Sequence, residues 1–245
     1  MTPPAELEGG YSRRVLRWVI GIAVASFLAA VVLTAFGPEL APKPSAGADS
    51  FSYSAVGHRG LVELLRGAGL TVTTRTITGG PGGGPRWPVV LAEPDPKRVA
   101  GDLGGHLDRL INDAQKDRGA AVVVLPKWQA KESSSRPGWA AEVTPRPTDS
   151  IVEELRRLAP SWFPSLELRR GAGTGLESCR WADTGADVAI HRQLAQSMVP
   201  IAGYEPVLTC PGGLLIGRRG PVWVIADPDL VNNHGLAHDE NVAAV

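Results

Sequence analysis

The amino-acid sequence predicts an α/β fold in which a mostly parallel sheet is flanked by helices and preceded by one transmembrane helix. Unbroken apolar runs at 120–125 and 222–226 are typical of strands buried on both faces of a parallel sheet. Between residues 54 and 125, strand-like runs alternate with apolar residues at helical spacing, which indicates strands connected by helices. Near the start of the chain, 19 consecutive residues carry no charge.

This uncharged stretch runs from Trp18 to Phe36. At about 1.5 Å per residue it is long enough to cross the roughly 30 Å hydrocarbon layer of a membrane as a helix. Arg13, Arg14 and Arg17 precede it. Because positive charge concentrates on the cytoplasmic side, residues 1–17 are predicted to lie in the cytoplasm, and the chain to span the membrane once.

Residues 37–49 are rich in Pro, Ala and Gly and are predicted to form a linker. Residues 50–245 would then form a domain outside the cytoplasm. A signal peptide cleaved after Ala46 is the alternative, but the apolar run exceeds the roughly 7 to 15 residues usual for such a peptide.

The chain contains 25 basic and 25 acidic residues, and this balance argues against nucleic acid as a partner. Its two cysteines, Cys179 and Cys210, would lie in an oxidising compartment if the domain is exported. They are either a disulfide pair or two buried thiols.

In the first half of the domain, Ser54 can cap a helix with apolar positions from Leu61 to Ala68, which Gly69 would end. Asp95-Pro96 begins a longer amphipathic helix with apolar positions from Val99 to Ala114, which Gly119 would close. The segments expected between and after these helices are strands at 70–75, 87–92 and 120–125 and a glycine-rich loop at 79–85.

In the second half, residues 127–148 are polar and are predicted to be a surface excursion, in which Trp128 and Trp139 are candidate recognition residues. Ser150 and Glu153 form a capping-box pattern for a helix that ends at Pro160. The remaining expected elements are short strands at 166–168, 188–190 and 206–208, a hairpin of 214–218 with 222–226, and a terminal helix at 240–245, whose shortness suggests that the natural domain continues.

The strand at 222–226 runs directly into a polar loop that contains Asp227, Asp229, Asn232, Asn233 and His234. Ligands of parallel sheets bind at the carboxyl ends of strands, so this loop is the candidate ligand-binding site. These residue types also form turns, and the other interpretation is that they cap turns and bond nearby backbone.

A metal site is an alternative for the same loop. Asp227, Asp229, His234, His238 and Asp239 offer carboxylate and imidazole ligands within thirteen residues. Gly235 argues against a regular helix that would align the two histidines.

Three segments resemble the bacterial family known as domain of unknown function 4350: Ser52-Tyr53-Ser54, the run from Val122 to Trp128, and the run from Val224 to Leu236 followed by Asn241. The resemblance implies a domain anchored in the cytoplasmic membrane, similar to flavodoxin-like sheets and class I glutamine amidotransferases, without an established activity. It adds Ser52, Tyr53, Ser54 and Asn241 to the candidate ligand-binding residues. It also implies protein partners in the envelope, in a system with a MoxR-type ATPase.

An amidotransferase needs a cysteine nucleophile on a strand-to-helix turn. Here the strand at 120–125 leads to Pro126-Lys127-Trp128, which offers no nucleophile. The leading hypothesis is therefore a noncatalytic binding or assembly module without a cofactor. The alternatives are a metal-dependent hydrolase, with Asp227 and Asp229 as ligands and His234 as base, and a small-ligand sensor with a pocket beneath Asp227 and Ser52–Ser54.

Overall fold

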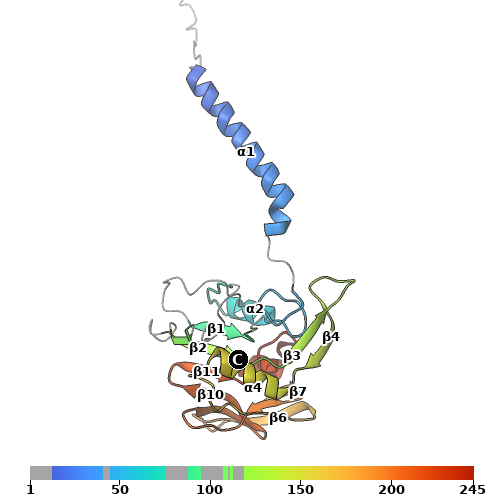
Figure 1. Ribbon diagram of the computed structural model, residues 1–245, viewed down its shortest axis with the longest axis vertical. Coiled ribbons are helices and arrows are strands. Elements are labelled where there is room, and N and C mark those ends of the chain that lie inside the picture. Colours follow the sequence, from blue (N-terminus) through green and yellow to red (C-terminus); the bar gives the residue numbers. More distant parts are fainter. Residues whose placement is uncertain (1–12, 41–44, 75–87, 95–106, 110, 113–118) are drawn as a thin grey trace, which may run out of the picture. The chain divides into compact units, whose positions relative to one another are not determined.

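The computed structural model describes residues 13–40, 45–74, 88–94, 107–109, 111–112 and 119–245. The chain separates into two compact units, Met1–Lys43 and Pro44–Val245 (Figure 1).

The first unit contains helix α1, which spans Arg13–Leu40. Its segment Arg13–Val32 has a mean hydropathy of 2.3 and is, by length and composition, able to cross a membrane. A helix is therefore present where the sequence predicts one. It continues four residues beyond Phe36, so the linker predicted at 37–49 begins too early.

The described end of the predicted linker belongs to the second unit. Ala46 is buried, and its carbonyl accepts a 2.8 Å hydrogen bond from the Ser54 hydroxyl. Asp49 likewise accepts a backbone bond from His58. Residues 45–49 are thus part of the folded domain, because their backbone is paired with it.

A nine-stranded sheet forms the framework of this domain, with the order β1-β2-β11-β10-β9-β6-β7 along its main path. The strands of that path are β1 (Val89–Ala92), β2 (Ala121–Val124), β11 (Val222–Ile225), β10 (Gly213–Arg219), β9 (Glu205–Cys210), β6 (Thr174–Trp181) and β7 (Asp187–Gln193). The other two strands, β5 (Leu168–Arg170) and β8 (Gln196–Met198), pair with each other, and β8 also pairs with β10.

The sheet is mixed, so the prediction of a mostly parallel sheet is wrong. β2 is parallel to both β1 and β11, whereas the other described pairings are antiparallel. Parallel neighbours need a long crossover, usually a helix. Two-residue turns at 211–212 and 220–221 instead join β9, β10 and β11 as antiparallel neighbours.

Side chains on alternate positions of the central strands build two cores. On one face, Val123 and Val224 pack with residues of helix α4 (Thr148–Leu158), whose buried positions are Ile151, Leu155 and Leu158. On the other face, Val124 and Ile225 pack with Leu61 of helix α2 (Arg59–Gly67). The carboxyl ends of the parallel strands are therefore held rigidly from both faces.

Several predicted elements have different bounds. Helix α2 begins at Arg59 rather than near Ser54, because the Ser54 hydroxyl is bonded to Ala46. Residues 70–74 form no strand. The predicted capping box of α4 does not form, since the Ser150 hydroxyl bonds back to the carbonyl of Pro147.

Most of the helix predicted from Asp95 lies outside the described residues, as does the glycine-rich loop at 79–85. The described residues 107–109 and 111–112 are helical, and Leu107 and Ile111 are buried in the first core.

The polar excursion is an antiparallel hairpin of β3 (Trp128–Glu132) and β4 (Ala140–Pro145). Trp139 is 50% exposed at its tip, whereas Trp128 is buried. Near the end of the chain, two 3-10 turns, Pro228–Leu230 and Gly235–Ala237, precede helix α5 (Asp239–Ala244).

Cys179 of β6 and Cys210 of β9 form a disulfide, with a Cα–Cα distance of 4.2 Å. Of the two alternatives that the sequence leaves open, the structure contains the disulfide, which joins strands that are neighbours in the sheet.

Candidate functional site

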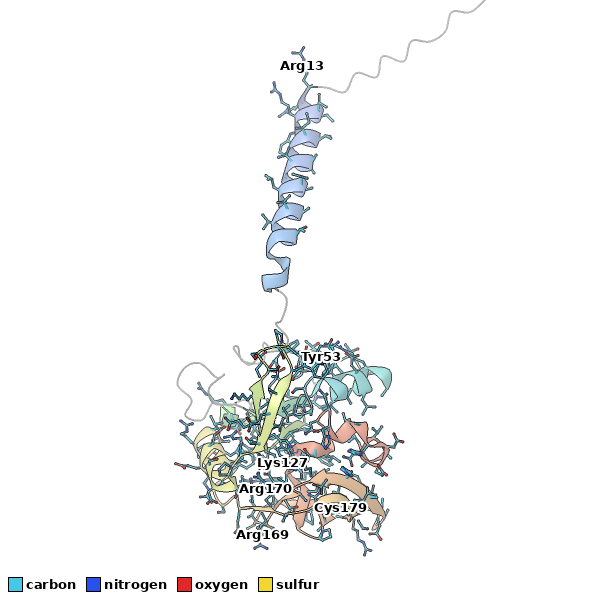
Figure 2. All side chains as sticks on the ribbon, turned by 90° about the vertical axis from the view of Figure 1, so that its right-hand side faces the viewer. Arg13, Tyr53, Lys127, Arg169, Arg170 and Cys179 are labelled. Carbon is cyan, nitrogen blue, oxygen red and sulfur yellow. A yellow bond between two sulfur atoms is a disulfide. The ribbon has the colours of Figure 1, made fainter. Side chains whose placement is uncertain are left out.

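The carboxyl ends of β1, β2 and β11 lie side by side, and each strand is followed by a buried charged residue. Glu93 follows β1, Lys127 follows β2, and Asp227 follows β11. Figure 2 shows Lys127 in the interior of the domain. This edge is where a ligand of a parallel sheet is expected.

Lys127, Asp227 and Asp229 form a fully buried charge cluster, here called the Lys127 cluster. The Lys127 ammonium donates to both oxygens of Asp227, at 2.8 and 3.0 Å, and to Oδ2 of Asp229 at 2.7 Å. Three charged groups are therefore removed from water together, which is tolerable only because they are paired and hydrogen-bonded.

Neighbouring groups satisfy the remaining lone pairs of the two carboxylates. Asp229 accepts hydrogen bonds from the Trp128 indole at 2.7 Å and from the Asn232 amide at 2.9 Å. Asp227 accepts from the backbone N–H of Asp229 at 3.0 Å and of Gln196 at 2.8 Å. The carboxylates thus hold the loop after β11 against β2 and β8.

The two carboxyl groups have pKa values shifted in opposite directions. Burial raises the pKa of Asp227 to about 6, against the opposing charge of Lys127. Burial alone would also raise the pKa of Asp229, but Lys127, Trp128 and Asn232 together hold it below its ordinary value. Asp229 differs because two side-chain donors in addition to Lys127 stabilise its ionised form.

A second cation, Arg192 of β7, lies beside this cluster. Its Nη1 is 3.8 Å from Asp227 and donates to the carbonyl of Gln196 at 3.0 Å, while its other terminal nitrogen pairs with Glu177. Arg192 is 1% exposed, so the buried ionic network extends from β11 to β6.

The position of Lys127 determines whether Asp227 and Asp229 can bind a metal ion. The Lys127 ammonium occupies the position between them that a metal cation would need. Asp227 and Asp229 cannot act as metal ligands unless Lys127 is expelled. Asp227 also caps the first 3-10 turn, in keeping with the structural interpretation of the loop.

The segment Ser52–Ser54 lies against the same loop. The Asn233 amide donates to the carbonyls of Ser52 and Ser54, at 2.9 and 2.7 Å, and accepts from the backbone N–H of Gly60 at 2.6 Å. Ser52 and Ser54 are buried, whereas Tyr53 is 51% exposed. Of these three residues, only Tyr53 is exposed to solvent.

Tyr53 and Asn233 line an open hollow of about 540 Å³, here called the groove. Its lining residues are Tyr53, Arg59, Gly60, Glu63, Leu64, Asn233, Leu236, Ala237 and Val242. The guanidinium of Arg59 lies over the Tyr53 ring, 4.2 Å from its centroid, and pairs with Glu63 at 3.6 Å. The groove is thus mostly apolar, with an aromatic ring and an ion pair at its rim.

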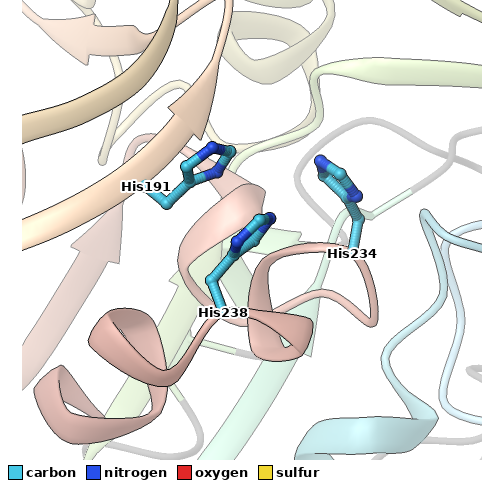
Figure 3. A group of neighbouring side chains, drawn as sticks. All are labelled: His191, His234 and His238. Atoms are coloured by element: carbon cyan, nitrogen blue, oxygen red, sulfur yellow. The ribbon is translucent and has the colours of Figure 1, made fainter.

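His234 and His238 meet a residue from a distant strand, His191 of β7. The rings of His191 and His238 are stacked with centroids 3.6 Å apart, and His234 lies edge-on to His238 at 5.4 Å. Figure 3 shows the three rings gathered together. Burial and the nearby His238 and His234 lower the pKa of His191.

Asn241, identified from the family resemblance, lies between this histidine group and the Lys127 cluster. Its side chain accepts from the backbone N–H of His191 at 2.7 Å and donates to the carbonyls of His191 and Asp229, at 2.9 and 3.0 Å. It is fully buried and acts as a clamp between β7 and the loop. Asp239 is exposed at the start of α5.

Sequence reasoning missed several members of these networks. The sequence could have indicated Lys127 as a site residue, because it follows a predicted strand in the same way as Asp227 does. The sequence gives no such indication for His191, Arg192 and Gln196, because local patterns do not reveal that β7 and β8 lie beside the loop. His58 and Glu93, a second buried pair at 3.0 Å, were missed for the same reason.

No protein-family model matches the chain. No curated protein matches it either. Among solved structures, it is similar to one titled "Crystal structure of glutamine amidotransferase", at 17% sequence identity and a TM-score of 0.42, over 76% of this chain and 94% of that chain. Membership of the domain of unknown function 4350 family therefore stays a prediction.

Proposed function

We propose that the chain is a noncatalytic binding module, tethered to the outer side of a bacterial cytoplasmic membrane, that docks an envelope protein in the groove. The observation that carries this proposal is that Asp227 and Asp229 of the loop after β11 are bonded internally, whereas the neighbouring groove has Tyr53, Arg59 and apolar side chains in its lining.

Two independent features support the location. Arg13, Arg14 and Arg17 precede the apolar part of α1, which favours a cytoplasmic amino terminus. The Cys179–Cys210 bridge lies in the other unit, and disulfides persist in oxidising compartments outside the cytoplasm. Both features favour the same orientation.

The absence of an amidotransferase nucleophile supports a noncatalytic role. The chain has two cysteines, and both are in the disulfide. The turn after β2 carries Pro126 and a buried Lys127, whose charge is paired with two aspartates. Fold likeness does not supply a missing nucleophile.

The lining of the groove favours a protein partner. Tyr and Arg are enriched among residues that dominate binding energy at protein interfaces, and in the groove an exposed Tyr53 contacts a half-buried Arg59. Leu64, Leu236 and Val242 provide an apolar floor. We infer a partner segment that places an apolar side chain in the groove and polar groups against Arg59 and Glu63.

The resemblance to domain of unknown function 4350 suggests a context for this partner. An envelope component of a system that includes a MoxR-type ATPase would meet the groove on the outer side of the membrane. The ATPase itself would act on the opposite side, where ATP is available.

The test is crosslinking in intact membranes followed by quantitative recovery of partners with the full-length chain. Tyr53→Ser and Arg59→Ser should each reduce recovery of a specific envelope protein at least about fivefold, as expected for hot-spot residues worth more than about 1 kcal/mol. Leu176→Ser is the matched control, because Leu176 is 59% exposed on β6 and does not line the groove.

Equal recovery by wild type and the two groove variants would contradict the proposed surface. If no protein is recovered specifically by the wild type, the groove is better explained as a small-ligand site, since its volume lies in the usual range of roughly 300–1,000 Å³.

A further inference from the structure

We propose that His191, His234 and His238 form a binding site for one divalent transition-metal ion of the zinc class. This site is separate from the Lys127 cluster and does not rest on the proposed function. Each histidine offers one ring nitrogen such that all three nitrogens lie within 4.8 Å of one another, and all three side chains are half-buried.

The composition of the group fits this class of ion. Three imidazoles are a known ligand set for zinc, with the fourth position left to water or another ligand. Imidazole also suits copper and nickel, whereas magnesium and calcium prefer oxygen ligands. The second group of potential ligands, Glu177 with Cys179 and Cys210, does not qualify because both sulfurs are in the disulfide.

The backbone positions of the three histidines are fixed by independent contacts. Asn241 clamps both backbone polar groups of His191. The His234 N–H donates to the carbonyl of Ala55 at 2.8 Å, and the His238 N–H donates to that of Gly235 at 3.0 Å. The backbone that carries this ligand set, from two distant parts of the chain, is therefore held in place before any ion binds.

A buried polar atom in this group lacks a partner. Among the described residues, Nδ1 of His191 is buried without a hydrogen-bond partner. Buried nitrogens normally have a partner, and this ring nitrogen, beside two other imidazoles, can serve as a ligand because no protein group occupies it. A metal ion would accept the lone pair of such a nitrogen directly.

The rings must adjust when the ion binds. Zinc–nitrogen bonds of about 2.0–2.1 Å require ligand nitrogens roughly 3.3 Å apart in a tetrahedral site. The His191 and His238 rings are only 19° from parallel, so their lone pairs do not yet converge. Rotation of one ring is inexpensive, because the χ2 torsion of histidine is broad.

The test is zinc titration of the full-length chain in detergent, prepared without a polyhistidine tag and stripped with a chelator. Calorimetry should show one zinc ion per chain, and cobalt should give the visible spectrum of a nitrogen-ligated ion. Magnesium at the same concentration should not bind. Outer partners of metal ligands typically contribute 10–100-fold in affinity, so losing a ligand itself should weaken zinc binding at least about 100-fold.

His191→Phe and His238→Phe are the informative variants, because phenylalanine keeps an aromatic ring in the stack and removes the nitrogens. Their melting temperatures without metal show whether they fold. His234→Ala is a further test variant: it removes one metal ligand without disturbing the stacked pair of His191 and His238. No zinc binding by the stripped wild type, or unchanged affinity in the folded variants, would overturn the proposal and leave aromatic packing as the role of these rings.

Discussion

Lys127 supplies one positive charge to two buried carboxylates, and this arrangement determines how the loop after β11 is used. The ammonium is within 3.0 Å of Asp227 and Asp229, and all three residues are inaccessible to solvent. An internal cation thereby takes the place that a bound cation would have in a metal-dependent enzyme. At the residue scale, Asp227 and Asp229 are structural residues of the loop, because their carboxylates are buried and paired internally.

We expect Lys127→Met to lower the free energy of unfolding by about 3–5 kcal/mol, because it leaves two buried carboxylates without their cation. Urea unfolding of the full-length chain in detergent, followed by tryptophan fluorescence, measures this loss. Arg180→Ala is the matched control: it breaks the exposed pair with Asp187, and such pairs contribute about 0–1 kcal/mol. A loss below about 1 kcal/mol for Lys127→Met would refute the structural role of the cluster.

At the scale of elements, the two 3-10 turns after β11 hold the groove, the histidines and the Lys127 cluster together. Leu236 and Ala237 line the groove, while His234 and His238 flank them in sequence. Asn241 joins α5 to β7 and to the backbone of Asp229. This connection depends on a close approach of two backbone segments at Gly235.

Gly235→Ala should destabilise the domain by more than about 3 kcal/mol, because a Cβ there would lie 1.4 Å from the carbonyl oxygen of Asp229. Gly67→Ala in α2 is the control: nothing lies within 4 Å of its Cβ position, and alanine should stabilise a helix by about 0.4–1 kcal/mol. Thermal unfolding of both full-length variants distinguishes these outcomes. Equal melting temperatures for Gly235→Ala and wild type would show that this approach is not required.

Part of this architecture could be predicted from local patterns. The apolar runs at β1, β2 and β11 and the turn at 220–221 have local signatures, and the structure contains all four. The antiparallel half could not be predicted in the same way. Positions along β6 alternate between exposed and inward-facing, but the residue types do not follow this alternation, since Leu176 is exposed and Glu177 is half-buried. The pairing partners of β6 and β7 are set by tertiary packing.

The candidate site was likewise predicted only in part from local sequence patterns. Asp227, Asp229 and Asn233 were found because they follow an apolar strand directly. Their partners, Lys127 and Ser52–Ser54, are at least 100 residues away along the chain, so no local pattern could show that the carboxylates are neutralised.

At the scale of the whole molecule, one unit carries a helix able to span a membrane and the other carries a disulfide and an exposed groove. Under the proposed function, the first unit would tether the protein to the membrane and the second would bind the partner. The groove is central to the proposed function, because Tyr53 is exposed there, whereas Asp227 and Asp229 of the neighbouring loop are buried.

Site-specific photocrosslinking in living cells tests this account most directly. A benzophenone amino acid at Tyr53, in the groove, is compared with the same group at Leu176, which does not line the groove, since these positions are 51% and 59% exposed. We expect a discrete adduct with one envelope protein from position 53 and none from position 176. No adduct at position 53, or the same adducts from both positions, would contradict the groove as the contact surface.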